Sequence, residues 1–126
     1  MSTELCGSFM RGAFQSAGQN CIGIERFLVH TDVYDSFVNM MAHKVRDLLV
    51  GAPLNSENKR VDMGSMISDR PIATLERLIG EAVKSGARLL AVGKKWTNPL
   101  FPRGHYFEPT LLVDVTSEMD ISRTEL

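Results

Sequence analysis

The sequence lacks a surplus of charge of either sign. Among its 126 residues, 14 Lys and Arg stand against 15 Asp and Glu, which leaves a net charge of -1. A nucleic-acid-binding domain needs a basic surface to neutralise phosphates, and an acidic interaction tail needs a run of like charges. The balance of charge therefore gives no indication of nucleic acid or another polyanion as a partner.

Long hydrophobic runs are also missing. No apolar stretch approaches the roughly 20 residues that a membrane-spanning helix requires. The first residues have neither the basic start nor the apolar core of a signal peptide. We therefore expect this part of the protein to be soluble, without a membrane segment in this window, and intracellular, either cytoplasmic or associated with an organelle.

Cysteine is scarce, since only Cys6 and Cys21 occur. These two could pair, but they do not make the disulfide framework of a small secreted domain. His30, His43 and His105 do not cluster with either cysteine at metal-ligand spacing, so we expect no metal site.

What the sequence does contain is an alternation of helical and strand-like periodicity, without repeats or low-complexity segments. Apolar residues recur at helical spacing in three segments: 3–16, a segment capped at Thr31 or Asp32 and running to Leu48, and a segment from Ser68 to a stop at Gly86. Apolar strand-like runs lie at 27–29, 88–92 and 106–115, and residues 51–68 form a long surface connection. The order strand, helix, helix, strand is the crossover arrangement of a parallel sheet, so we predict an α/β fold.

The segment from Phe14 to Cys21 carries the main chemical signal. It places a single cysteine just past a Gly-Gln turn, where a helix ends. Cysteine attacks as the thiolate, so a functional cysteine must be accessible and close to backbone N–H groups that can hold an oxyanion. From the spacing alone, the alternative of a small buried packing residue is the more common one.

The order of residues around Cys21 resembles the cysteine signature of the aldehyde dehydrogenase superfamily: a small residue, Gly-Gln, one variable residue and the catalytic cysteine. Two further motifs follow in the family's order. Residues 104–112 are similar to its glycine, aromatic, x-Pro-Thr strand, and residues 119–126 are similar to the run that leads into its Glu-x-Phe-Gly-Pro motif. The match extends from Arg11 to Leu126. The sequence from Gln19 to Arg26 is most similar to a fungal and plant-like branch of the superfamily.

The resemblance implies that the chain is part of a larger enzyme, because the family's architecture needs a chain several times longer. We expect residues 1–126 to be a partial catalytic domain with a Rossmann-like parallel sheet, truncated at both ends and without the dinucleotide-binding domain. No Gly-rich dinucleotide-binding turn is present. In the intact parent, the family implies a homo-oligomer that oxidises a small-molecule aldehyde to a carboxylic acid with NAD or NADP.

The resemblance also implies a role for two residues. The Cys21 thiolate would attack the aldehyde carbonyl to form a thiohemiacetal, with its own backbone N–H as one oxyanion donor. Glu125 matches the family glutamate that binds the nicotinamide ribose, since a carboxylate can accept from both ribose hydroxyls. The family's general base is a glutamate in a Glu-Leu-Gly-Gly-Lys motif upstream of the cysteine. Glu4 does not match this motif, because it is only 21 − 4 = 17 residues from Cys21, about half of the separation that the family pattern needs, and Ser8 stands where the motif has Lys. The general base would therefore lie outside this chain.

Two function classes stay open at this point. In the first, the chain is the cysteine-bearing piece of an NAD(P)-dependent oxidoreductase and is inactive alone. In the second, it is a non-catalytic truncated product, which acts as an interaction or regulatory piece if it acts at all. The sequence does not decide the aldehyde, the choice of NAD or NADP, or the oligomeric state.

Cys6 lies in the leading helix and is expected to be a packing residue.

Overall fold

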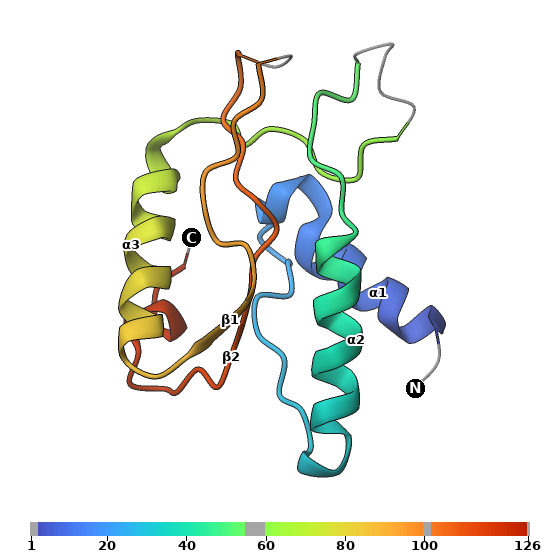
Figure 1. The fold of residues 1–126 in the computed structure, drawn as a ribbon, viewed down its shortest axis with the longest axis vertical. Helices are drawn as coiled ribbons and strands as arrows, with labels where there is room; N and C mark the ends of the chain where they lie inside the picture. The colour runs from blue at the N-terminus through green and yellow to red at the C-terminus, as the bar shows by residue number, and fades with distance from the viewer. Residues whose placement is uncertain (1–2, 55–59, 100–101, 126) are drawn as a thin grey trace.

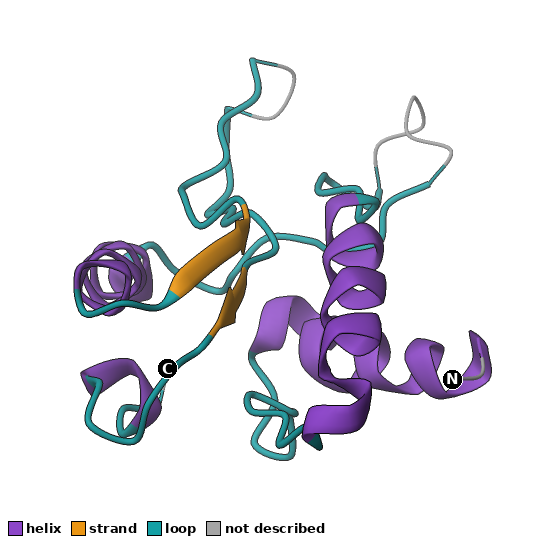
Figure 2. Cartoon of the chain, turned by 60° about the horizontal axis from the view of Figure 1, so that its bottom comes forward, coloured by secondary structure: helices purple, strands orange, loops and turns teal. Residues whose placement is uncertain are grey.

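The computed structural model describes residues 3–54, 60–99 and 102–125. Its longer helices are α1 (Thr3–Phe14), α2 (Tyr34–Arg46) and α3 (Arg70–Lys84), and its strands are β1 (Arg88–Ala91) and β2 (Leu111–Val113). Short 3-10 turns are η1 (Gln15–Gly18), η2 (Thr31–Val33) and η3 (Asp120–Ser122). Helices lie on both sides of the strands, with α1 and α2 on one side and α3 and η3 on the other (Figures 1 and 2).

The side chains of β2 connect the two sides because successive strand residues point to opposite faces of a sheet. Leu111 packs against the cluster of Cys6, Phe37 and Met41 between α1 and α2. Leu112 packs in the opposite direction, against the buried residues of α3 and its surroundings. The molecule therefore has two separate apolar cores that share β2.

Strand direction differs from the sequence prediction. The predicted α/β class holds, but β1 and β2 pair antiparallel, with Arg88 opposite Val113 and Leu89 opposite Leu112. The sequence predicted a parallel sheet from the order of the segment at 27–29, two helices and the strand at 88–92, whereas the sheet in the described chain is antiparallel. The connection from β1 to β2 contains no helix among its described residues, so it cannot act as the right-handed crossover that a parallel pair requires.

The segment predicted as a buried parallel strand at residues 27–29 is extended but is not part of a sheet in the described chain. Phe27 and Val29 point inward and pack against the α1–α2 core. Leu28, between them, is 95% exposed. This alternation is typical of a strand with one covered face, whereas a strand covered on both faces would also bury Leu28.

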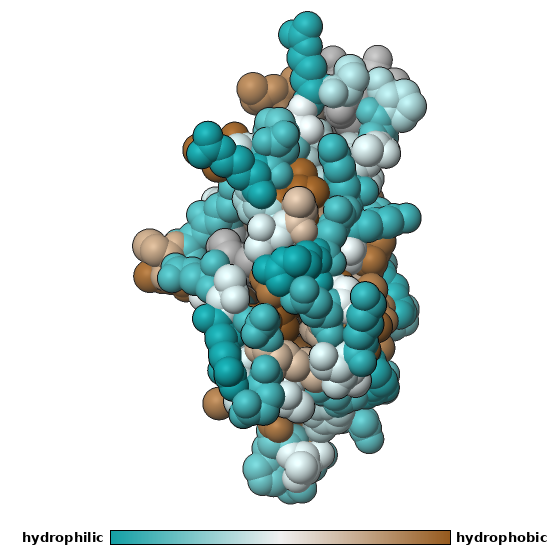
Figure 3. Space-filling view, turned by 90° about the vertical axis from the view of Figure 1, so that its left-hand side faces the viewer, coloured by the Kyte–Doolittle hydropathy of each residue, from teal (hydrophilic) through white to brown (hydrophobic). Residues whose placement is uncertain are grey.

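The helices agree with most of their predicted apolar faces, but Val33 and Val83, which the helical spacing also placed on these faces, are exposed. On α2, Phe37, Met41 and Val45 are buried as expected. On α3, Ile72, Ile79 and Ala82 are buried, and hydrophilic side chains cover most of the face seen from the α3 side (Figure 3).

The predicted caps are less accurate than the faces. His30, rather than Thr31 or Asp32, precedes η2, and its Nδ1 accepts the Asp32 N–H at 3.3 Å. Asp69, rather than Ser68, precedes α3, and it makes no side-chain cap bond. Gly86 ends the α3 turn as predicted, at φ 107, where its N–H donates to the Val83 carbonyl.

Candidate functional site

Helix α1 ends in a strained turn that leads directly to Cys21. Ser16 and Ala17 both have φ 57, and Gly18 follows at φ 79. Only the glycine adopts this left-handed region without a steric penalty. The two other residues each store about 1–3 kcal/mol of strain, a feature that clusters at functional sites.

The turn places Cys21 on the surface beside Asn20. The Asn20 side-chain oxygen accepts the Ile22 N–H at 3.3 Å, which closes a local turn around the cysteine. The Cys21 Sγ lies 4.0 Å from the same oxygen. Within the described chain, the Cys21 backbone N–H has no acceptor, so it is free to bind an oxygen of a substrate.

After Cys21 the chain turns back along α1 by a close backbone approach. Ile24 donates its N–H to the Gly12 carbonyl at 2.9 Å. A Cβ on Gly23 would lie 2.9 Å from the Asn20 carbonyl oxygen, closer than real Cβ contacts, so this position requires glycine. Cys21 therefore lies in a tight turn, residues 20–24, between the end of a helix and an extended segment.

An apolar groove of about 800 Å³ opens beside this turn. Residues 23–29 line one wall and residues 107–117 line the other, with side chains of α2 and α3 at its sides. Gln19 and Gly23, on either side of Cys21, line the groove, but Cys21 itself does not. Glu108 also lines it, and its buried Oε2 has no hydrogen-bond partner among the described residues.

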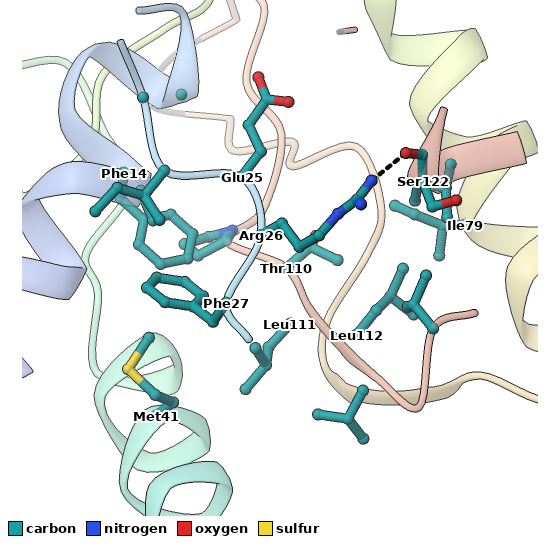
Figure 4. Close-up of a pocket in the computed structure, with 18 of the residues that line it drawn as sticks. Phe14, Glu25, Arg26, Phe27, Met41, Ile79, Thr110, Leu111, Leu112 and Ser122 are labelled. Carbon is teal, nitrogen blue, oxygen red and sulfur yellow. Dashed lines mark hydrogen bonds between the residues drawn. The ribbon is translucent and has the colours of Figure 1, made fainter. Parts of the chain in front are cut away.

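The Arg26 side chain reaches across the groove in the close-up view (Figure 4). Arg26 Nη2 donates to the Ser122 carbonyl oxygen in η3, as the dashed line in Figure 4 shows. Phe27, Leu111 and Met41 lie on the α2 side of this contact, and Leu112 and Ile79 lie on the α3 side. The hydrogen bond therefore joins the segment after Cys21 to the segment before Glu125.

Glu125, the second residue singled out from the sequence, is exposed and follows η3. No contact joins it to Cys21, although Thr124 lines the groove next to it. Its carboxylate has no hydrogen-bond or ionic partner in the part of the chain that the structure describes. The structure thus puts the cysteine and the glutamate on segments linked through Arg26, without bringing their side chains together.

Cys6 and Cys21 are both free thiols with opposite surroundings. Cys6 is fully buried in the α1–α2 core, as expected of a packing residue, and Cys21 is exposed. Among the residues with described positions, no group of three or more His, Cys, Asp or Glu could hold a metal ion. In the same ranges, no helix has the length and apolar character needed to cross a membrane.

A charged cluster that contributes Tyr34 and Asp114 to the lining of the groove was not predicted from the sequence. Asp114 accepts the Tyr34 hydroxyl and the Arg88 Nε, each at 2.5 Å. The bond from Arg88, followed by that from Tyr34, lowers the pKa of Asp114, and the bond to Asp114 raises the pKa of Tyr34. These residues are 80 and 26 positions from Asp114, so spacing along the chain gave no signal for their meeting.

Comparison with known proteins places this arrangement in a family. Residues 3–126 match the aldehyde dehydrogenase family. An aldehyde dehydrogenase-like protein of Saccharomyces cerevisiae is 47% identical over 97% of this chain, which corresponds to 19% of that protein. The 3,6-anhydro-alpha-L-galactose dehydrogenase of Vibrio sp. is 38% identical over 97% of this chain and 25% of its own length.

Solved structures agree with the sequence matches. A 3,6-anhydro-L-galactose dehydrogenase, solved in complex with NAP, has a TM-score of 0.81 at 38% identity, over 92% of this chain and 24% of its own. The chain thus spans between 19% and 25% of the length of these relatives. The family match over nearly every residue, together with the shared fold, confirms the expectation from the cysteine motif: the chain belongs to the aldehyde dehydrogenase family.

Proposed function

We propose that this chain carries the nucleophile of an NAD(P)-dependent aldehyde dehydrogenase, with Cys21 in that role. The observation that carries the proposal is the position of Cys21: exposed, just after a strained turn, with its own N–H free of acceptors in the described chain. The relatives whose names state an activity are dehydrogenases, which supports the same reaction class.

The chemistry follows from the thiol and its free N–H. The Cys21 thiolate attacks the aldehyde carbon, and the carbonyl electron pair moves to oxygen, where the Cys21 N–H stabilises the negative charge. NAD(P)+, when bound, accepts the hydride of the former aldehyde. With that hydride acceptor in place, collapse of the oxyanion would leave a thioester on Cys21, and water would release the carboxylic acid and restore the thiol.

Glu125 fits one part of the cofactor. A free, exposed carboxylate can accept hydrogen bonds from the two hydroxyls of a nicotinamide ribose. One carboxylate does not make a dinucleotide site, so the remaining contacts would have to come from protein outside this chain. We therefore expect the 126-residue chain alone to be inactive, and millimolar NAD+ to leave its thermal melting curve unchanged.

A chimera tests the proposal directly. Residues 3–126 would replace the matched segment of the Vibrio sp. dehydrogenase, and reduced nicotinamide formation would be followed with the sugar aldehyde as substrate. We expect activity in the chimera, loss to background with Cys21→Ser, and retained turnover with Cys6→Ser. Substantial activity in the Cys21→Ser chimera would overturn the assignment.

Glu125→Gln in the same chimera tests the second role. The amide keeps one acceptor but weakens the contact with the ribose, so the nicotinamide should be less well aligned and the hydride step slower. The readout is a larger primary isotope effect with deuterated aldehyde. An unchanged isotope effect and an unchanged rate would remove Glu125 from the site.

A further inference from the structure

We propose that Gln19 is a positioning residue, which holds the strained turn before Cys21 and fastens it to the segment that precedes α3. The proposal rests on the proposed function only for its catalytic consequence. Its structural part concerns two hydrogen bonds of one side-chain amide.

The Gln19 side-chain amide donates one hydrogen bond and accepts another. Its Nε2 donates to the Ser16 carbonyl oxygen at 2.9 Å. Its Oε1 accepts the Ile67 backbone N–H at 3.0 Å, across 48 positions of sequence. A carbonyl can only accept and an N–H can only donate, so the two partners fix the orientation of the amide. The site needs a side chain with one donor and one acceptor at this reach, which is what glutamine supplies.

The first bond acts on the strained residues. Ser16 is the first of the three left-handed residues, and its carbonyl also accepts the Gln19 backbone N–H at 3.2 Å. A left-handed backbone at a serine and an alanine persists only where its surroundings over-determine it. The Gln19 side chain thus closes the turn a second time, directly before Asn20 and Cys21.

The second bond attaches the turn to a fixed point. Met66, next to Ile67, donates its N–H to the His105 carbonyl at 2.7 Å, and its side chain is buried in the α3-side core. Ala17 of the strained turn packs against that same core. The Gln19–Ile67 bond and the Ala17 contact therefore bind the turn to one rigid region at two places.

The consequence under the proposed function is a loss of alignment at Cys21. Without the Gln19 bonds, the strained turn can relax toward an ordinary backbone conformation, and the cysteine shifts with it. A displacement of about 1 Å at a reacting group lowers a rate by about 100-fold. The cofactor contact at Glu125 lies on another segment and should be unaffected.

Hydrogen exchange in the full 126-residue chain tests the structural part without any reaction. We expect the Ile67 amide to be protected, to lose its protection in Gln19→Met, and to keep it in Gln19→Glu, which retains an acceptor. Gln15→Leu is the matched control, because Gln15 is exposed and its side chain makes no hydrogen bond with the described residues. An Ile67 amide that exchanges equally fast in the unmodified chain and in Gln19→Met would overturn the proposal.

The Vibrio sp. chimera tests the catalytic part. Gln19→Met should lower kcat by about 100-fold while leaving the KM for NAD(P)+ unchanged, and Gln19→Glu should recover part of the loss. Gln15→Leu should match the unmodified chimera. An unchanged kcat in Gln19→Met, or an equal loss in Gln15→Leu, would refute the positioning role even where Cys21→Ser confirms the nucleophile. If the chimera is inactive, the exchange of the Ile67 amide decides alone.

Discussion

At the scale of single residues, the two thiols differ only in their surroundings. Cys6 has no exposed surface, whereas Cys21 stands on an exposed turn after α1. The spacing around Cys21 alone favoured a buried packing residue, and only the resemblance to the family's cysteine signature implied an accessible thiol, which agrees with its exposed position. Nothing in the spacing predicted the hydrogen bond from Gln19 to Ile67, since that contact depends on where a distant segment folds back.

Alkylation should therefore distinguish the two cysteines. We expect iodoacetamide to modify Cys21 in the native chain and Cys6 only after denaturation, because a reagent cannot reach a fully buried sulfur. Mass spectrometry of the digested chain gives the modified site, and the Cys21→Ser chain is the control. Equal labelling of both thiols under native conditions would contradict the packing of α1 against α2.

The charged cluster at Asp114 predicts a pH dependence of stability. The pKa of Asp114 lies below 3.8 in the folded chain, so its contribution is fully present above the unfolded value and is lost as pH falls through the folded pKa. Both partners of the Arg88–Asp114 pair are more than a third exposed, so solvent screening keeps this contribution to stability small.

Asp114→Asn isolates the contribution of the Asp114 charge to the stability of the fold. The variant should lose that stability above pH 4 and approach the unmodified chain in more acidic solution, because both chains then lack the carboxylate charge. Urea unfolding at a series of pH values measures it, with Asp35→Asn as a control for a solvated acid. A constant difference across the whole range would show that Asp114 acts by packing rather than by charge.

At the scale of elements, the helices were predictable and the sheet was not. The apolar faces of α2 and α3 follow from local spacing, which one helix determines by itself. The direction of a strand depends on its partner, so the apolar run at 106–115 did not reveal an antiparallel pairing with β1. His30 illustrates the same limit at a helix start, because its cap uses a ring nitrogen that sequence rules for Ser, Thr, Asp and Asn do not include.

Two glycine-to-alanine substitutions should have opposite effects on stability, one within helix α3 and one in the tight turn after Cys21. Gly80→Ala lies within α3 with no atom within 4 Å of the new Cβ, and it should raise the free energy of unfolding by about 0.5–1 kcal/mol. Gly23→Ala would bring a Cβ against the Asn20 carbonyl and should lower it by about 1–3 kcal/mol. Chemical denaturation of both variants checks the pair, and a neutral Gly23→Ala would mean that the turn after Cys21 is loose.

At the scale of the whole molecule, the open apolar groove is the feature that most affects how the chain behaves in solution. The groove has a volume of about 800 Å³. Ile22 beside its wall and Leu28 in its wall are 84% and 95% exposed. Contiguous exposed apolar surface of this kind drives association. The chain spans about a fifth to a quarter of the length of the relatives it matches.

The isolated chain should consequently self-associate. We expect its apparent mass in light scattering to rise with concentration, and Leu28→Lys to reduce that rise by placing charge on the exposed apolar surface. Lys84→Ala, on the far side of α3, is the control. A monomer with a cooperative melt at all concentrations would contradict the idea that this chain needs more protein around it.

The shared strand β2 also has a consequence for the order of folding. Helices α1 and α2 lie close in sequence, yet their core is closed by Leu111, which lies 111 − 6 = 105 positions from Cys6. Closing so long a loop is slow and entropically unfavourable until its contacts form. On a ribosome, the first half of this chain would emerge with its core unfinished and would wait for the last strand. We therefore expect pulse-labelled hydrogen exchange to show α2 protected late, together with β2, and early protection of α2 alone would show that the first core can assemble by itself.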